Sequence, residues 1–184
     1  MNFLAISGSL RSASSNSALL RATARLATPD TPIEVFLGLG ELPLFNPDIE
    51  ATNPRPVAKL RSQILAADAL IIASPEYAHG ITGALKNALD WMVGSEAFVN
   101  KPIALFNAAP RATHAYAALR EVVTMMSARV VNESSIVLPV GGYGLDEEGI
   151  YADPDMSVSI RAALRALSHA VAELREHEQF ATSS

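Results

Sequence analysis

The chain has 184 residues, no cysteine and a formal net charge of -5 at pH 7, and a chain of this length buries about 70% of the surface that its unfolded form exposes. Because cysteine is missing, disulfides, thiolate nucleophiles and cysteine-ligated metal clusters are excluded, and any redox chemistry needs a bound cofactor. The acidic balance argues against nucleic acid as a partner, since non-specific affinity for a phosphate backbone depends on a basic surface.

The first residues of the sequence do not have the pattern of a signal peptide. Met1 leads directly into an apolar stretch without basic residues before it, and no apolar run reaches the roughly 18 residues of a membrane span. We therefore expect no signal peptide, no membrane partner and a cytoplasmic location. We also expect residues 1–180 to form a single domain and residues 181–184 to be a disordered tail.

The first half of the chain alternates between short apolar runs and segments with helical spacing. The nearly all-apolar first run and the run D-A-L-I-I-A-S suit strands buried on both faces, whereas the mixed polarity of I-E-V-F-L suits an edge strand. The long loop G-L-G-E-L-P-L-F-N-P-D-I-E follows this edge strand. The predicted strands are 2–7, 33–37 and 69–74, and the predicted helices are 15–27, 57–67 and about 80–94.

The second half continues the alternation, with strands predicted at 102–106 and 134–138 and helices at about 115–128 and 157–178. Between the last strand and the last helix, the repeated glycines of G-G-Y-G-L-D-E-E-G predict a long flexible loop. Its acidic residues lack the D-x-D-x-D-G spacing of a calcium loop. We interpret them as solvated, or as part of a lid over a neighbouring subunit's site.

Strands and helices that alternate with short connections predict an α/β fold with a parallel sheet, helices on both faces and right-handed crossovers. Five strands favour a flavodoxin-like three-layer sandwich with a five-stranded parallel sheet in the order 2-1-3-4-5. In this architecture the ligand lies outside the carboxyl ends of the strands, where the strand order reverses. The loops after strands one, three and four carry the informative residues, and all of them would emerge there.

The most informative stretch is I-S-G-S-L-R-S-A-S-S-N-S, where the first strand turns into the first helix. The start of a helix offers unpaired N–H groups and a partial positive charge, which favour a bound anion. An ordinary helix cap explains only one polar residue here, and the turn fits neither a P-loop nor a dinucleotide motif. We therefore predict a phosphate site formed by Ser9, Arg11, Ser14, Ser15 and Asn16.

The third strand ends abruptly at Pro75-Glu76-Tyr77. Pro75 lacks a backbone donor and forces the preceding residue into an extended conformation, which leaves the backbone of residues 76–80 free to face a ligand. Tyr77 offers a ring for stacking on a planar heterocycle, although taken alone it reads as a half-buried aromatic residue. For Glu76 we predict a role of the backbone rather than of the side chain.

Three motifs together resemble the NADPH-dependent FMN reductase family, which includes bacterial quinone, chromate and azo-dye reductases with a flavodoxin-like fold. They are G-S-L-R-S-A-S-S-N, L-P-L-F-N-P-D-I-E and P-E-Y-A-H-G-I-T-G-A-L-K-N-A-L-D-W. The likeness is strong over the first half of the chain and depends mainly on element order in the rest.

The resemblance implies a bound FMN, with NADPH or NADH as the co-substrate. It places the phosphate of FMN on the five residues of the first turn, and it places the flavin ring against Pro75, Glu76, Tyr77 and Ala78. It also implies a homodimer or homotetramer, with the helix around residues 86–91 near a subunit interface.

Two departures from the family pattern concern the flavin ring. The family usually has Asn after P-E-Y and this chain has Ala78, so only the backbone can serve there. The loop after the fourth strand is commonly glycine-rich but reads N-A-A-P-R-A-T here, which leaves flavin contacts by Asn107 and Arg111 open. An inward Arg111 would favour the anionic reduced flavin, whereas a solvated side chain is the ordinary state of a loop arginine.

The resulting hypothesis is an FMN-dependent NAD(P)H oxidoreductase in which the cofactor carries the chemistry and no side chain has an assigned catalytic role. Quinones are the expected small-molecule acceptors, followed by free flavin, azo dyes and metal oxyanions, in a ping-pong scheme. A flavodoxin-type electron carrier and an FMN-binding module without turnover are the alternatives. Carriers typically show an acidic rim around the flavin, whereas this turn carries Arg11.

Four other residues have side chains that could bind a metal ion or transfer a proton. His169, Glu173 and His177 share one helical spacing, but an exposed helix face carries such residues routinely, so we expect no metal site. His79 lies beside the expected flavin ring and stays unassigned.

Overall fold

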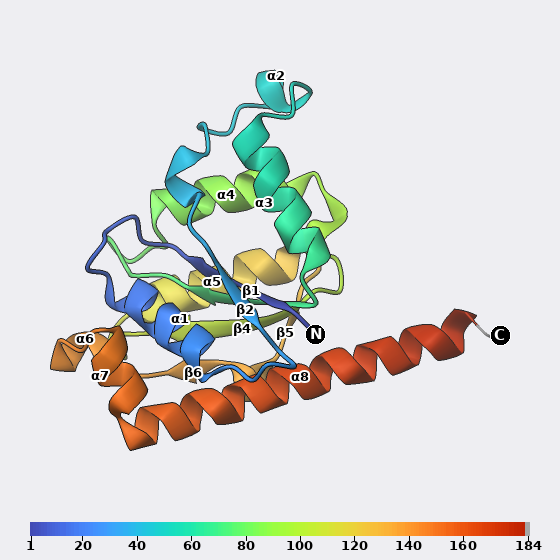
Figure 1. Cartoon of the computed structure of the whole chain (residues 1–184). Helices are drawn as coiled ribbons and strands as arrows, with labels where there is room; N and C mark the ends of the chain where they lie inside the picture. Colours follow the sequence, from blue (N-terminus) through green and yellow to red (C-terminus); the bar gives the residue numbers. More distant parts are fainter. Residues whose placement is uncertain (183–184) are drawn as a thin grey trace.

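The computed structural model describes residues 1–182 and contains a parallel sheet with helices on both faces (Figure 1). The strands are β1 (Phe3–Ser7), β2 (Ile33–Phe36), β3 (Ala69–Ala73), β4 (Pro102–Asn107), β5 (Arg129–Val130) and β6 (Ile136–Val137). The helices are α1 (Ser15–Leu26), α2 (Pro47–Glu50), α3 (Arg55–Ala66), α4 (Gly83–Val93), α5 (Thr113–Met125), α6 (Val140–Tyr143), α7 (Glu147–Ala152) and α8 (Pro154–Thr182).

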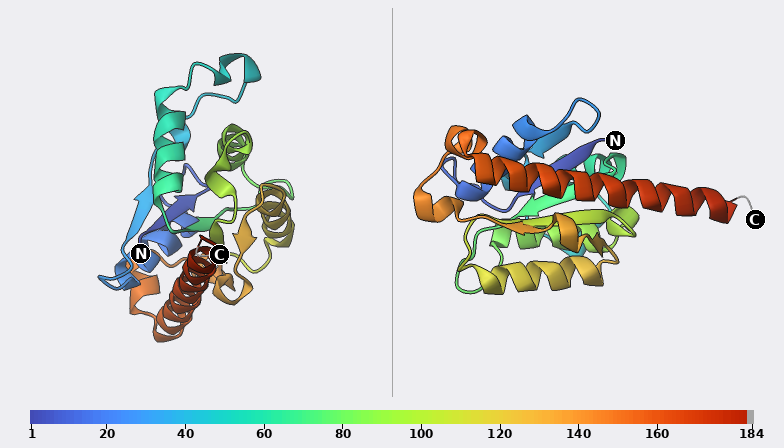
Figure 2. Two further views of the ribbon diagram at one scale, coloured as in Figure 1. Left: turned by 90° about the vertical axis from the view of Figure 1, so that its right-hand side faces the viewer. Right: turned by 90° about the horizontal axis from the view of Figure 1, so that it is seen from below.

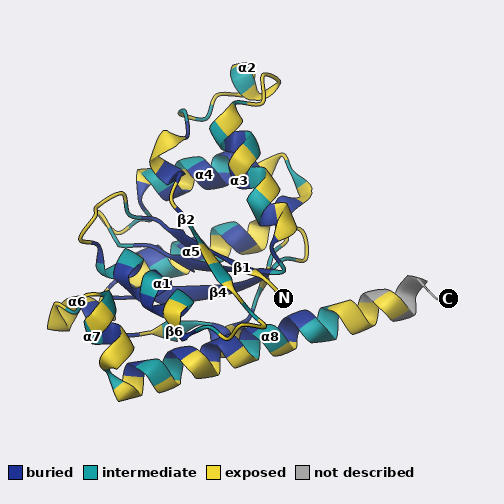
Figure 3. Cartoon of the chain, viewed as in Figure 1, coloured by how far each residue is buried: buried dark blue, intermediate teal, exposed yellow. Residues whose placement is uncertain are grey.

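The sheet has the order β2-β1-β3-β4-β5 with parallel pairing, so the predicted flavodoxin-like architecture is confirmed. β1, β3 and β4 are buried along their whole length, and successive side chains of a strand point to opposite faces. Phe3 and Ala5 belong to the core under α1 and α8, whereas Leu4 and Ile6 belong to the core under α3, α4 and α5 (Figure 3). Strands that are apolar on both faces therefore occupy the middle of three layers.

The last position in the sheet is shared by two strands of two residues each. β5 pairs with the start of β4, and β6 pairs with its end. Between them Asn132–Ser134 form a 3-10 turn, and the Ser135 hydroxyl accepts the N–H of Leu105 at 3.1 Å in place of a strand carbonyl. Of the strand predicted over 134–138, only Ile136–Val137 form, because Ser and Asn side chains before them compete with the strand ladder for backbone partners.

The segment after β6 folds into α6 and α7, so the prediction of a long flexible loop is wrong. Asp146 caps α7 by accepting a backbone N–H at 2.9 Å. Glu147 pairs with Arg21 at 2.9 Å and Glu148 pairs with Arg25 at 2.7 Å, and these ion pairs join α7 to α1. The acidic residues of this segment thus stabilise α7 by pairing with a segment that is far away in the sequence.

α8 is longer at both ends than the helix predicted over 157–178. The N–H of Met156 donates to the Asp153 side chain at 2.9 Å, which caps the first turn. The helix crosses one face of the sheet, and its last turns project beyond the sheet (Figure 2). Of the expected tail over 181–184, residues 181 and 182 continue α8, and residues 183 and 184 lie outside the described residues. Across residues 1–182, no helix has the length and apolar character needed to cross a membrane.

The loop from Leu42 to Glu50 is fastened to α4. The Asn87 amide accepts the N–H of Phe45 at 2.7 Å and donates to the carbonyl of Pro43 at 2.9 Å. Trp91 donates its indole N–H to the same carbonyl at 2.8 Å and meets the ring of Phe45 edge-on at 5.1 Å. The motifs L-P-L-F-N-P and K-N-A-L-D-W therefore contact each other in the fold.

A tight turn follows β3, where Tyr77 and Gly80 exchange two backbone hydrogen bonds of 3.0 Å. The two residues between them have positive φ, 49° at Ala78 and 60° at His79. Two consecutive left-handed residues are the mark of the type I′ hairpin turn, which favours Asn-Gly. A left-handed conformation costs a non-glycine residue roughly 1–2 kcal/mol, so Ala-His is a strained pair for this turn.

Ala78→Asn should stabilise the protein, because Asn adopts positive φ more readily than Ala. We expect the free energy of unfolding to rise by about 0.5–1 kcal/mol, measured by urea denaturation. Ala117→Asn is the matched control: Ala117 is exposed within α5, where Asn is the poorer helix former, so stability should fall slightly. Destabilisation by the same amount at both positions would contradict a strained turn.

Candidate active site

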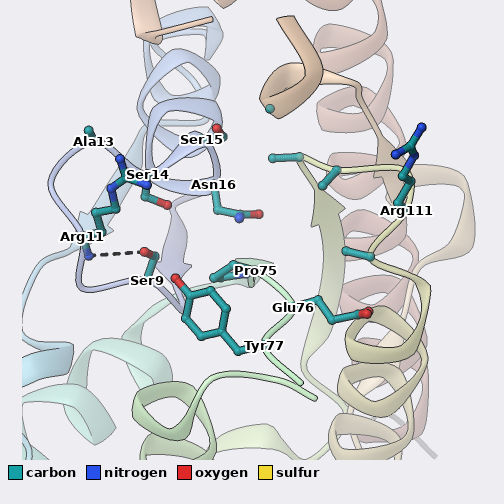
Figure 4. Close-up of a pocket in the computed structure, with 14 residues that line it drawn as sticks. Ser9, Arg11, Ala13, Ser14, Ser15, Asn16, Pro75, Glu76, Tyr77 and Arg111 are labelled. Atoms are coloured by element: carbon teal, nitrogen blue, oxygen red, sulfur yellow. Dashed lines mark hydrogen bonds between the residues drawn. The ribbon is translucent and has the colours of Figure 1, made fainter. Parts of the chain in front are cut away.

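A cavity of about 430 Å³ opens at the carboxyl ends of β1, β3 and β4 (Figure 4). Its walls are the turn between β1 and α1, the loop after β3, the loop after β4 and the start of α6. Sites for cofactors and small ligands typically have volumes of about 300–1,000 Å³, so the cavity has a suitable size. The predicted site residues that line it are Ser9, Arg11, Ser14, Ser15, Asn16, Pro75, Glu76, Tyr77 and Arg111.

Gly8 lets the first wall approach the end of β3. A Cβ atom at this position would lie 2.7 Å from the Ser74 hydroxyl and 3.2 Å from the Leu85 side chain. Gly8 donates its N–H to the carbonyl of Ala73 at 2.7 Å, and its own carbonyl accepts the hydroxyl of Thr82. The turn is therefore held in place by the two elements that border it.

The serines of the turn have different roles. Ser14 is the N-cap of α1 and accepts the N–H of Ser17, and the Ser17 hydroxyl bonds that of Ser7 at 2.7 Å. Ser9 accepts the N–H of Arg11 at 3.3 Å across the turn (Figure 4). Capping therefore uses Ser14 alone, and it does not account for the other polar residues of this wall.

Asn16 presents a buried polar group to the cavity. The residue is 5% exposed, and its carboxamide oxygen has no hydrogen-bond partner among the described residues. Leaving such a group unpaired costs about 1–3 kcal/mol, and an amide that turns over can offer either its oxygen or its NH2 group to a ligand. The first turn of α1, a helix of 12 residues, adds free N–H groups beside it. These donors fit a phosphate group.

The second wall is the loop from Pro75 to Tyr77. The Tyr77 ring is exposed and lies below the cavity with its hydroxyl toward Ser9 (Figure 4). The Glu76 carboxylate points to α5 and accepts the N–H of Ala115 at 2.8 Å. It caps a helix whose own N-cap residue makes no side-chain cap. One oxygen of the Glu76 carboxylate thus ties this loop to α5.

Ala78 and Asn107 are the predicted site residues that do not line the cavity. Ala78 is exposed in the tight turn. Asn107 is buried, and its amide donates to the carbonyl of Ala112 at 3.1 Å and accepts the N–H of Ala109 at 2.9 Å. Asn107 therefore fixes the shape of the loop after β4 and leaves the cavity surface to its neighbours.

Small residues that no motif marks complete the third wall. Ala108, Ala109 and Ala112 line the cavity, and Gly141 of α6 joins them by donating its N–H to the carbonyl of Ala108 at 3.0 Å. Residues without polar side chains carry no chemical signal, so their role becomes visible only in the fold. Arg111 is exposed, and its side chain points away from the wall formed by the loop after β3 (Figure 4).

Possible metal ligands do not gather at this cavity. Within residues 1–182, the structure contains no group of three or more His, Cys, Asp or Glu side chains placed to hold a metal ion. His169 lies 3.5 Å from Glu173 on α8, where the His169 side chain is 76% exposed.

Comparisons with known sequences indicate the same kind of ligand site as the cavity does. The model of the NADPH-dependent FMN reductase family matches residues 1–141. An NAD(P)H-dependent FMN reductase of Pseudomonas aeruginosa is 35% identical over 178 residues, which cover 94% of this chain and 96% of that protein. A quinone reductase of Pseudomonas putida is 36% identical over 115 residues, which cover 60% of this chain and 61% of that protein.

A solved structure supports the fold. FerB, a flavoenzyme NAD(P)H:(acceptor) oxidoreductase from Paracoccus denitrificans, superposes with a TM-score of 0.75. The two chains are 24% identical, and the match covers 92% of this chain and 98% of FerB. From the family match and the Pseudomonas aeruginosa relative, we conclude that the chain belongs to the NADPH-dependent FMN reductase family.

Proposed function

We propose that residues 1–180 form one FMN-binding domain that oxidises NAD(P)H and reduces quinones, or similar acceptors such as flavins, azo dyes and metal oxyanions. The observation that carries the proposal is the unpaired carboxamide oxygen of Asn16 beside the start of α1, at a cavity of cofactor size. The relatives named as FMN and quinone reductases support the same class of reaction. Bound FMN would supply the two-electron chemistry needed between NAD(P)H and an acceptor.

The turn between β1 and α1 would hold the phosphate of FMN. Arg11 supplies a positive charge, and Ser9, Ser15 and Asn16 supply polar groups at the cavity surface. The Ser14 hydroxyl accepts a backbone N–H as a cap and still has its own proton to donate. Charge-assisted and neutral hydrogen bonds would therefore converge on one anion.

The flavin ring would lie against Pro75, Glu76 and Tyr77, which line the cavity, with its polar edge toward the backbone of Ala78 in the adjacent turn. The bonds within the tight turn use the N–H groups of Tyr77 and Gly80. The N–H groups of Ala78 and of the residue after it take no part in these bonds, so they are available to the polar edge of the ring. Arg111 would stay at the solvent side of the cavity, where it adds positive charge without fixing the ring.

Assembly and location complete the proposal. The loop bound to α4 exposes Leu44 (82%) and the end of α4 exposes Val93 (64%), and burial of such side chains would favour a homodimer or homotetramer. Light scattering after size-exclusion chromatography tests this assembly, and a monomer at all concentrations would overturn it. We propose a cytoplasmic location because NAD(P)H is held inside cells.

Arg11→Ala should weaken the binding of FMN. A charge-assisted contact to phosphate contributes about 1.5–3 kcal/mol, which corresponds to roughly ten- to a hundred-fold in the dissociation constant. Riboflavin lacks the phosphate, so its binding should hardly change. Isothermal titration with both ligands measures the effect.

Arg55→Ala is the matched control for Arg11→Ala. It removes one exposed positive charge at the start of α3, outside the cavity, and should leave both dissociation constants unchanged. Equal losses of FMN and riboflavin affinity in Arg11→Ala would show that Arg11 supports the fold or the ring and does not hold the phosphate.

Turnover should follow ping-pong kinetics, because the sequence carries no second nucleotide motif and both substrates would use the same face of the ring in turn. Initial rates at several fixed quinone concentrations should give parallel double-reciprocal lines against NADPH. Intersecting lines would mean that both substrates bind together. A protein that binds FMN but does not oxidise NAD(P)H would instead be an electron carrier.

A further inference from the structure

Two histidines connect the loop after β3 to the start of α5, at the end of the cavity where the flavin ring would lie. The rings of His79 and His114 stack at a centroid distance of 4.2 Å with 19° between their planes. His79 lies two residues after Tyr77, and His114 lies two residues after Ala112, and both Tyr77 and Ala112 line the cavity. The pair is exposed to solvent, so it can exchange protons with water at the edge of the site.

His79 lies in a strained stretch of backbone. Its φ of 60° follows the φ of 49° at Ala78, and strained backbone that survives in a native fold often marks a functional site. The bond from the N–H of Ala115 to the Glu76 carboxylate lies beside the stack and fastens the same loop to the same helix. Two independent contacts thus hold the His79 ring in one place.

Different elements carry the two rings of the stack. His114 is the second residue of α5, so its backbone is fixed by the helix. His79 lies in the tight turn after Tyr77, which lines the cavity. Within a few residues of His79 and His114 in the sequence, the other charged side chains are Glu76 and Arg111. Glu76 is bound to the start of α5, and Arg111 is exposed.

We propose that His79 donates the proton that a quinone takes up at this site, and that His114 positions the His79 ring. Reduction of a quinone to a hydroquinone consumes two electrons and two protons. A hydride from the reduced cofactor brings both electrons and one proton, and the second proton passes from the His79 imidazolium to a quinone oxygen. Water then returns a proton to His79. This inference rests on the proposed use of quinones as acceptors.

His79→Asn tests the proton transfer, because Asn keeps the left-handed turn and removes the acid. In stopped-flow oxidation of the reduced holoenzyme, the quinone rate should fall by at least about tenfold, since a positioned general acid commonly contributes about 100-fold or more. The rate with ferricyanide, which takes electrons without a proton, should stay unchanged, and added imidazole should restore the quinone rate. His114→Gln should give a smaller loss, and the control His169→Asn on α8 should give none.

Equal losses with quinone and ferricyanide in His79→Asn, or no loss with either, would overturn the proton transfer. Wild-type protein that reduces neither acceptor would instead contradict the proposed function. NMR of the imidazole protons tests the stack without cofactor. Because the two rings stack at 4.2 Å, ring currents should shift the His79 signals, and this shift should disappear in His114→Gln. His79 signals that are the same in the wild-type protein and in His114→Gln would overturn the positioning role of His114.

Discussion

The close approach of β1 and β3 at their carboxyl ends is the constraint on which the site depends. A side chain at Gly8 would collide with the Ser74 hydroxyl, so only glycine lets the first turn lie against the end of β3. This approach brings two distant segments together: the polar turn before α1 and the loop from Pro75. The first offers donors for an anion and the second offers a surface for a flat ring, at a distance set by the sheet.

The loop after β3 takes its shape from α5. Glu76 supplies the cap that α5 lacks, and His79 stacks on His114 in the first turn of that helix. These contacts offset the strain of two left-handed residues in the tight turn. α5 follows the loop after β4, and it therefore also determines the geometry of the loop after β3.

The sheet order and the polar turn could be predicted from the sequence because their signals are local. Strands that are apolar on both faces indicate a buried parallel sheet, and polar donors at the start of a helix indicate an anion site. The shape of the final strand and of α7 could not be predicted, because Ser135 acts on Leu105 and Glu147 acts on Arg21. These two pairings exist only once distant segments meet. Asn107 differs, because its partners Ala109 and Ala112 lie in its own loop. The sequence pattern alone does not distinguish an amide that braces a loop from one that contacts a ligand.

Anaerobic mixing of the FMN-loaded protein with one equivalent of NADPH tests the central claim most directly. The visible absorbance of the flavin is followed first after NADPH and then after addition of a quinone. The account predicts that NADPH removes this absorbance and that the quinone restores it without oxygen. Flavin that stays oxidised in the presence of NADPH would contradict the account.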